Sequence, residues 1–186
     1  AILLKEFFLQ LVKIGGEFQK QHVALQTMLG DAAQADKIFS QLKNLAIESP
    51  FKFSDLTKFG KQLAAYSVPY EELYDTTKRL SDISAGLGVD MQRIILAYGQ
   101  IRSAKVLKGT ELRQLTEAGI PMVDALAKKL SQLEGQVVST GEVFKRISNK
   151  EISFDMVKDS LWQMTDAGGQ FYNMQEKLTN PLSGQW

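Results

Sequence analysis

The stretch Gly99–Leu126, GQIRSAKVLKGTELRQLTEAGIPMVDAL, decides how the chain folds because it ends one helix, contains a second and begins a third. Gly119 is placed to end the middle helix, since glycine adopts positive φ at little steric cost. In such a stop, Ile120 follows the glycine and packs on Leu115. Pro121, with its fixed φ, then suits the first turn of the next helix. The stretch therefore predicts a tight corner between helices.

Helix starts are predicted on both sides of this corner. They fall at Ser54, Asp90, Thr110, Ser139 and Ser153, whose side chains can accept a hydrogen bond from the first helical turn. No alternation of apolar and polar residues is long enough for a strand. Short helices with short connections predict an all-α fold, an irregular multi-helix bundle with a longer amphipathic N-terminal helix or helical hairpin.

An apolar stripe marks the N-terminal residues. It comprises Leu4, Phe7, Leu11, Ile14, Phe18, Gln21, Leu25 and Met28. Steps of three and four residues fit either a helix packed on its own core or a coiled-coil seam with a partner chain. Gly15-Gly16 weakens the middle of this helix and favours a kink. Gly30-Asp31 is typical of a stop followed by an N-cap, which favours a hairpin. The same stripe resumes through Ala32, Ala35, Phe39, Leu42 and Ala46, so one long bent helix also fits.

Three segments are predicted from these signals. Residues 1–48 are an N-terminal amphipathic helical segment that can form a coiled coil, residues 49–179 are a helical domain, and residues 180–186 are a loose C-terminal end. Ser49-Pro50 separates the first two, because the residue before a proline avoids the α conformation. The chain begins with alanine and stops just after Gly184, so we expect a fragment of a longer protein.

The composition excludes several classes of protein. The 186 residues carry 22 basic and 21 acidic side chains, a formal net charge of +1, which is not the footprint of a nucleic-acid binder. Cysteine is absent, so the fold stands without disulfides or cysteine metal ligands. No apolar run reaches the eighteen residues of a membrane span. We therefore expect neither nucleic acid nor membrane as a partner of this fragment.

Residues suited to catalysis are few and scattered. His22 is the only histidine, which excludes multi-histidine metal sites, and a solvent-facing helix position is expected for it. The best carboxylate candidates are Glu71, Glu72, Asp82 and Glu111, and the sequence places none of them opposite another across a cleft. We predict no catalytic, cofactor-binding or metal-binding residue, no cofactor and no enzymatic activity.

Two further patterns have structural interpretations. The glycines within 86–88 and 168–169 are typical of helix ends, since neither pair follows a strand. Phe51 and Phe53 flank a loop and are expected to be partly exposed. A small basic cluster fits a solvated face or a contact for an acidic partner helix, and it comprises Arg102, Lys105, Lys108 and Arg113.

Five short motifs recur in one family. They are SPF at 49–51, LGVDM at 87–91, Gln100, LRQLTEAGIP at 112–121 and MTDAGGQF at 164–171. In this order and spacing they resemble the conserved helical domain of phage tail tape measure proteins, over about Leu45 to Gly184. The chain departs from the pattern at 179–184, TNPLSG, which keeps the closing Leu-Ser-Gly but has Asn-Pro where a polar residue and a threonine are expected.

The resemblance implies a long, largely helical virion protein of a phage or prophage tail. Such a protein lies in the tail tube during assembly, sets the tube length and leaves ahead of the DNA. It implies assembly in the host cytoplasm, with tail-tube, tail-tip or tail-chaperone proteins as partners. The apolar stripe separately allows self-association through the N-terminal helix. A rise of about 1.5 Å per residue makes length control by a helical chain physically reasonable.

Two alternatives stay open. One is a helical protein-interaction module, an adaptor or assembly chaperone, with the stripe from Leu4 to Met28 as its contact surface. The other is a lysozyme-like enzyme, which would need an acid of raised pKa in an apolar pocket. The sequence carries no motif that such chemistry requires.

Overall fold

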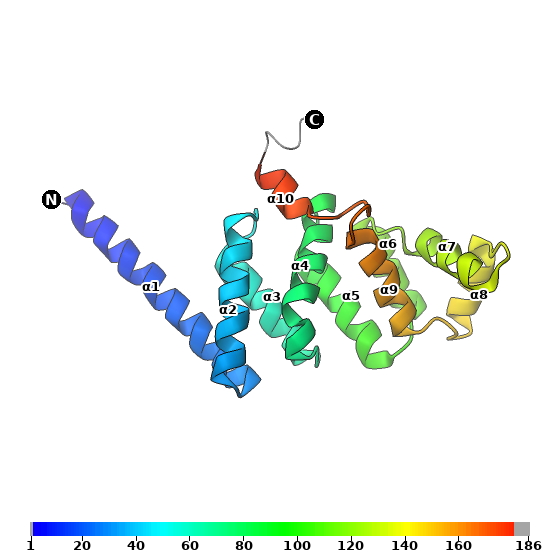
Figure 1. The fold of residues 1–186 in the computed structure, drawn as a ribbon, viewed down its shortest axis with the longest axis horizontal. Coiled ribbons are helices and arrows are strands. Elements are labelled where there is room, and N and C mark those ends of the chain that lie inside the picture. The colour runs from blue at the N-terminus through cyan, green and yellow to red at the C-terminus, as the bar shows by residue number, and fades with distance from the viewer. Residues whose placement is uncertain (1, 181–186) are drawn as a thin grey trace. The chain divides into compact units, whose positions relative to one another are not determined.

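The computed structural model of the protein describes residues 2–180, apart from the side chains of Leu11 and Ile14. Within that range it contains ten α-helices, no strand, and one isolated antiparallel bridge between Val106 and Ser153 (Figure 1). The predicted all-α multi-helix fold is confirmed.

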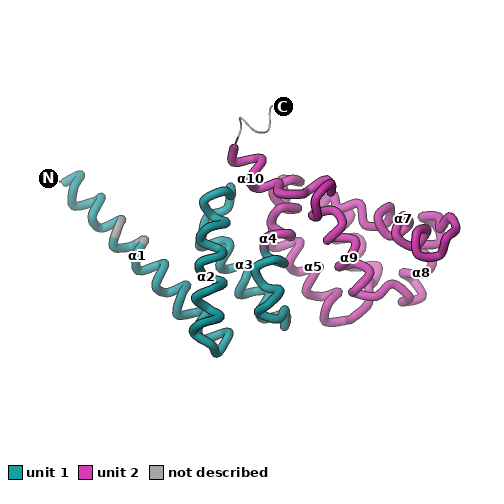
Figure 2. Tube along the Cα trace, viewed as in Figure 1, with its two compact units in different colours: residues 1–77 teal, residues 78–186 magenta. Residues whose placement is uncertain are grey.

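The helices are short, apart from the first. In chain order they are α1 (Ile2–Leu29), α2 (Ala32–Ile47), α3 (Phe53–Ala65), α4 (Tyr70–Leu87), α5 (Met91–Ala104), α6 (Gly109–Ala118), α7 (Met122–Glu134), α8 (Thr140–Ser148), α9 (Phe154–Thr165) and α10 (Met174–Thr179). The chain forms two compact units, residues 1–77 and 78–186 (Figure 2). The loose end predicted for residues 180–186 lies, apart from its first residue, outside the described part of the chain.

The first unit begins with a helical hairpin. Gly30 has a left-handed backbone with φ 68°, and the Asp31 carboxylate accepts a hydrogen bond of 3.1 Å from the backbone N–H of Gln34. The chain reverses between these residues, so α1 and α2 pack against each other and the single bent helix is excluded. α1 itself runs through Gly15-Gly16 as one helix.

The core of this unit lies among α1, α2 and α3. Leu25, Leu42 and Leu63, one from each helix, are fully buried. α3 begins at Phe53, one residue before the predicted cap at Ser54, and no side-chain cap bond is made there. The prediction for Ser54 is wrong because burial of the Phe53 ring draws that residue into the first helical turn.

The predicted corner at Gly119 is confirmed in the second unit. Gly119 has φ 96°, and the Ile120 N–H donates to the carbonyl oxygen of Leu115 at 2.9 Å. Ile120 and Leu115 are both buried, as a stop of this type requires. Pro121 immediately precedes α7 and its carbonyl accepts the first helical hydrogen bond, from Ala125 at 3.1 Å.

Three of the four caps predicted in this unit are confirmed. The side chains of Asp90, Ser139 and Ser153 accept hydrogen bonds from backbone N–H groups two or three residues later, at 2.9, 3.1 and 3.2 Å. The cap at Thr110 is wrong, because α6 already begins at Gly109. The bridge explains the difference: Leu107 N–H donates to a carbonyl at 2.9 Å, and this holds the backbone extended until the helix starts.

The MTDAGGQF segment is the turn that joins α9 to α10. A Cβ on Gly169 would lie 2.4 Å from the carbonyl oxygen of Met164, so no side chain fits there. Phe171 is buried against Gly86, where an added Cβ would lie 2.8 Å from its ring. The prediction that Gly86 helps to end α4 is therefore corrected: it lies in the last turn of the helix and makes room for Phe171, whereas Gly88 ends the helix with φ 66°.

Polar contacts anchor this turn and α10 to α4. Asp82 is buried, and its carboxylate accepts hydrogen bonds from Lys78 at 2.9 Å and from the backbone and side chain of Gln175, each at 3.0 Å. Arg79 donates to the carbonyl of Trp162 at 3.2 Å and to the Asp166 carboxylate at 2.6 Å. Since buried polar groups need partners, these contacts fix where the C-terminal helix lies within the unit.

Replacing Gly119 by alanine tests the corner. A left-handed backbone costs a non-glycine residue about 1–2 kcal/mol, so Gly119→Ala is expected to lower the free energy of unfolding by that amount. The matched control is Gly109→Ala, in open space and without positive φ, which should leave stability unchanged or raise it by up to about 1 kcal/mol. Urea unfolding of both variants decides, and equal effects would contradict the assignment of strain to position 119.

Replacing Arg79 by methionine tests the anchor. Arg79→Met removes an ion pair to the exposed Asp166 and the part-buried hydrogen bonds to Trp162 and Thr165, so we expect a loss of about 1–3 kcal/mol. Arg93→Met is the control, because Arg93 and Glu117 lie 4.0 Å apart on the surface and such pairs contribute about 0–1 kcal/mol. Thermal unfolding measures both, and a loss for Arg79 no larger than for Arg93 would argue against an anchoring role.

Candidate functional site

His22 is engaged with α2 and is not simply solvent-facing. Its Nε2 pairs with the Asp36 carboxylate, and its ring lies 4.8 Å from that of Phe39 between centroids. His22 was predicted to face solvent; its side chain is 33% exposed, and it is also partnered because the hairpin brings α2 alongside. The pair links α1 to α2.

The candidate carboxylates do not converge. Glu71 and Glu72 lie in the first turn of α4, where acidic residues favour the helix dipole, and Glu111 has the same place in α6. Asp82 is buried and its oxygens are used by Lys78 and Gln175. Among the described residues no group of three or more histidine, cysteine or acidic side chains could hold a metal ion. One Glu111 oxygen is buried without a hydrogen-bond partner, but none of these acids lies opposite another.

The basic cluster beside the corner divides into two kinds of residue. Arg102 is half-buried, and its guanidinium lies over the Phe154 ring, 5.5 Å from the centroid. Lys105, Lys108 and Arg113 are exposed, and Lys105 has a left-handed backbone at the end of α5. The contact between Arg102 and the Phe154 ring was not predicted, since Phe154 is 52 residues away in the chain.

The N-terminal half of α1 exposes an unusually apolar surface. Every described side chain between Ile2 and Glu17 is exposed. Seven of these are large and apolar, with 59 to 82% of their area exposed, and they form what we call the α1 apolar surface: Ile2, Leu3, Leu4, Phe7, Phe8, Leu9 and Val12. Figure 1 shows this half of the helix extending away from α2 and α3. Exposed apolar patches of this kind mark interaction sites.

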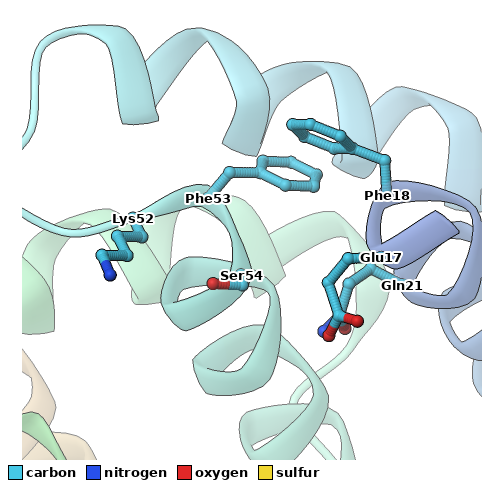
Figure 3. Close-up of a pocket in the computed structure, with 6 residues that line it drawn as sticks. All are labelled: Glu17, Phe18, Gln21, Lys52, Phe53 and Ser54. Atoms are coloured by element: carbon cyan, nitrogen blue, oxygen red, sulfur yellow. The ribbon is translucent and has the colours of Figure 1, made fainter. Parts of the chain in front are cut away.

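An apolar groove lies where α1 meets the start of α3. Its volume is about 230 Å³, and it is lined by Glu17, Phe18, Gln21, Lys52, Phe53 and Ser54 (Figure 3). The Phe18 and Phe53 rings face each other with centroids 4.9 Å apart. The Gln21 Oε1 atom is buried and accepts no hydrogen bond. The groove directly follows the α1 apolar surface along the same helix.

The sequence predicted the apolar face of α1 but not the groove between α1 and α3. The stripe through Leu4 and Phe7 predicted an apolar face on α1. The groove was missed because Phe53 was expected to be partly exposed, whereas its ring is buried against Phe18 and, edge to face at 4.8 Å, Phe39. Phe51 is half-buried, as predicted. No pattern within residues 49–53 distinguishes the two phenylalanines.

These surfaces define a class of protein. The described residues include buried or paired acids, a paired histidine, an exposed apolar helix and a groove suited to apolar side chains. The exposed apolar helix and the apolar groove are features that bind other polypeptides. A helix that packs along an apolar surface is a common mode of such binding. In the part of the chain that the structure describes, no helix combines the length and apolar character needed to cross a membrane. The class is a helical structural protein that associates with other chains.

Comparison with known families identifies the protein family. The family model described as "Tape measure protein" matches residues 9–184, nearly the whole chain. The chain therefore belongs to the tape measure protein family and is a domain of a phage tail protein. Neither a curated protein nor a solved structure matches it significantly.

A pair of substitutions tests whether the α1 apolar surface is separate from the core. Phe7→Ser with Phe8→Ser should change the free energy of unfolding by no more than about 0.5 kcal/mol, because both rings are already exposed. Phe53→Ala, in the buried cluster, should cost about 3–5 kcal/mol. Denaturant unfolding compares them. A large loss in the serine double variant would mean that the chain covers this surface itself.

Proposed function

We propose that the chain is a folded docking module of a tape measure protein that takes part in tail assembly and in the determination of tail length. The observation that carries the proposal is the family match over residues 9–184. The family is a structural one, and we assign no catalytic step to this chain.

The dimensions of the helices favour docking over direct measurement by this domain. A rod of 186 helical residues would be about 280 Å long. The longest helix, α1, has 28 residues and is about 42 Å long. The ten separate helices of residues 2–180 therefore contribute little length while the domain is folded. Length is then set by other helical parts of the parent chain, while this domain holds the chain to its partners.

The partners we propose are other tail proteins. Residues 49–179 act as the docking module, and residues 1–48 supply the associating segment with the α1 apolar surface. A partner that offers an apolar helical surface suits α1, and we propose the tail tube, tail-tip proteins and tail chaperones as the candidates. The protein is then assembled in the host cytoplasm and carried in the virion.

A second candidate rests on the α1 apolar surface alone. An adaptor or assembly chaperone also exposes an apolar helix, and it needs no tail tube for its role. The two candidates differ in one consequence. Tail length responds to the length of the parent chain only if the protein measures the tail.

Tail length is the decisive measurement. An in-frame deletion in a helical stretch of the parent gene, outside this domain, should shorten tails by about 1.5 Å for each residue removed, the rise of an α-helix. Electron microscopy of purified particles measures this. Tails of unchanged length would refute the measuring role and leave the adaptor.

A matched variant within the domain separates docking from measurement. Leu4→Asp with Phe7→Asp places charges on the α1 apolar surface without touching the core. We expect fewer assembled tails, with normal length in those that form. Shortened tails from this variant would contradict a docking role for α1.

A further inference from the structure

A pocket of about 350 Å³ lies between α2 and the start of α4, within the first unit. Gln34, Ile38 and Gln41 line it from α2, at spacings that place them on one face of the helix. Ile38 is 2% exposed, so it closes the pocket on the side of the core. The volume is at the low end of the range for ligand pockets, about 300–1,000 Å³, and suits one long side chain.

The α4 side of the pocket combines aromatic rings with carboxylates. Tyr70 and Tyr74 lie one helical turn apart, and so do Glu71 and Asp75, and all four residues line the pocket. The face of a tyrosine ring attracts a cation, and a carboxylate attracts it by charge. This wall of the pocket therefore offers two kinds of interaction that favour a cationic group.

The pocket has a negative charge. Glu71, Asp75 and Lys37 line it with a net charge of −1, and Asp31 lies close enough to act on the same tyrosine. The charge of Glu71 is the main cause of a raised pKa at the Tyr70 hydroxyl, so the phenol stays neutral. Lys37 is exposed, and among the described residues it forms no ion pair. It therefore does not neutralise the carboxylates by direct contact.

We propose that this pocket binds the side chain of an arginine that a partner polypeptide supplies. Arginine fits better than lysine, because its flat guanidinium stacks on aromatic rings and its five N–H groups need several acceptors. The lining has acceptors on both walls. They are the carboxylates of Glu71 and Asp75 on α4 and the amide oxygens of Gln34 and Gln41 on α2.

The inference deepens the docking role and rests on it for the source of the arginine. A charged side chain bound in this way gives specificity and faster association more than high affinity, so it adds to the apolar contacts of the domain. An arginine titration measures the pocket alone, whereas tail length measures the role of the parent chain. Failure of the titration removes the arginine site and leaves the tail-length result unchanged. Tails of unchanged length would leave an arginine site on an adaptor.

N-acetyl-arginine amide is the probe for the first test, because it carries the side chain on an uncharged backbone. NMR signals of the tyrosine rings in the 186-residue chain report its binding. The signals of Tyr70 and Tyr74 should shift and saturate with a roughly millimolar dissociation constant. Tyr172 is 37% exposed, compared with 38% for Tyr70, and is the control for unspecific contact. Equal and unsaturated shifts at Tyr70 and Tyr172 would overturn the proposal.

Two related probes test the charge and the source of the ligand. N-acetyl-citrulline amide has the same planar shape without the charge, and it should bind at least about fivefold more weakly. Free L-arginine should bind no more tightly than the capped form, because its added carboxylate meets an acidic wall. Citrulline binding equal to arginine binding overturns a cation site. A tenfold preference for free arginine overturns the assignment to a partner polypeptide.

Two substitutions should change the affinity for N-acetyl-arginine amide in opposite directions. Glu71→Gln removes a carboxylate and should raise the dissociation constant about two- to fivefold, whereas Lys37→Gln removes a competing cation and should lower it by a similar factor. Asp155→Asn changes an exposed acid in the first turn of α9, so it is the matched control and should bind as wild type. Weaker binding in both pocket variants, or unchanged binding in both, would refute the proposed site.

Discussion

The left-handed backbone at Gly119 is the constraint on which the second unit depends. It lets Ile120 turn back and donate to the Leu115 carbonyl, so both apolar side chains enter the core while α7 leaves in a fixed direction. α7 then packs against α8 and α9. A chain without disulfides has to fix its corners by backbone geometry and packing alone. Gly30, Gly88, Gly135 and Gly168 are left-handed as well, so the same device ends several other segments.

Corners and caps could be predicted because they depend on residues within about five positions. Asp90, Ser139 and Ser153 needed only a side-chain oxygen and a free N–H group in the next turn. The failures have distant causes. Ser54 lost its cap because Phe53 packs on Phe18, and Thr110 lost its cap because the chain near Leu107 pairs with residues more than 40 positions away.

The C-terminal anchor lay beyond local patterns altogether. Asp82 and Gln175 are 93 positions apart, and no sequence motif indicates that they are in contact. Gly86 was assigned to a helix end because its usual role is local, whereas here it makes room for Phe171. The motif MTDAGGQF could be recognised as a family feature, but its physical reasons emerge only in three dimensions. Gly169 has no room for a Cβ, and Arg79 binds Asp166. The groove at Phe53 was missed for the same reason.

The stability of the exposed half of α1 depends on a balance between the cost of its two glycines and the gain from burying its apolar side chains. Two glycines in succession weaken the helix by roughly 2 kcal/mol relative to alanine, and isolated helices of about 15 residues are marginal in water. The first half of α1 lacks the core contacts that stabilise the second half. Burying one Leu or Phe side chain contributes about 1.5–3 kcal/mol, so a partner that covers even two of them offsets both glycines. The order of residues 2–16 is then coupled to association.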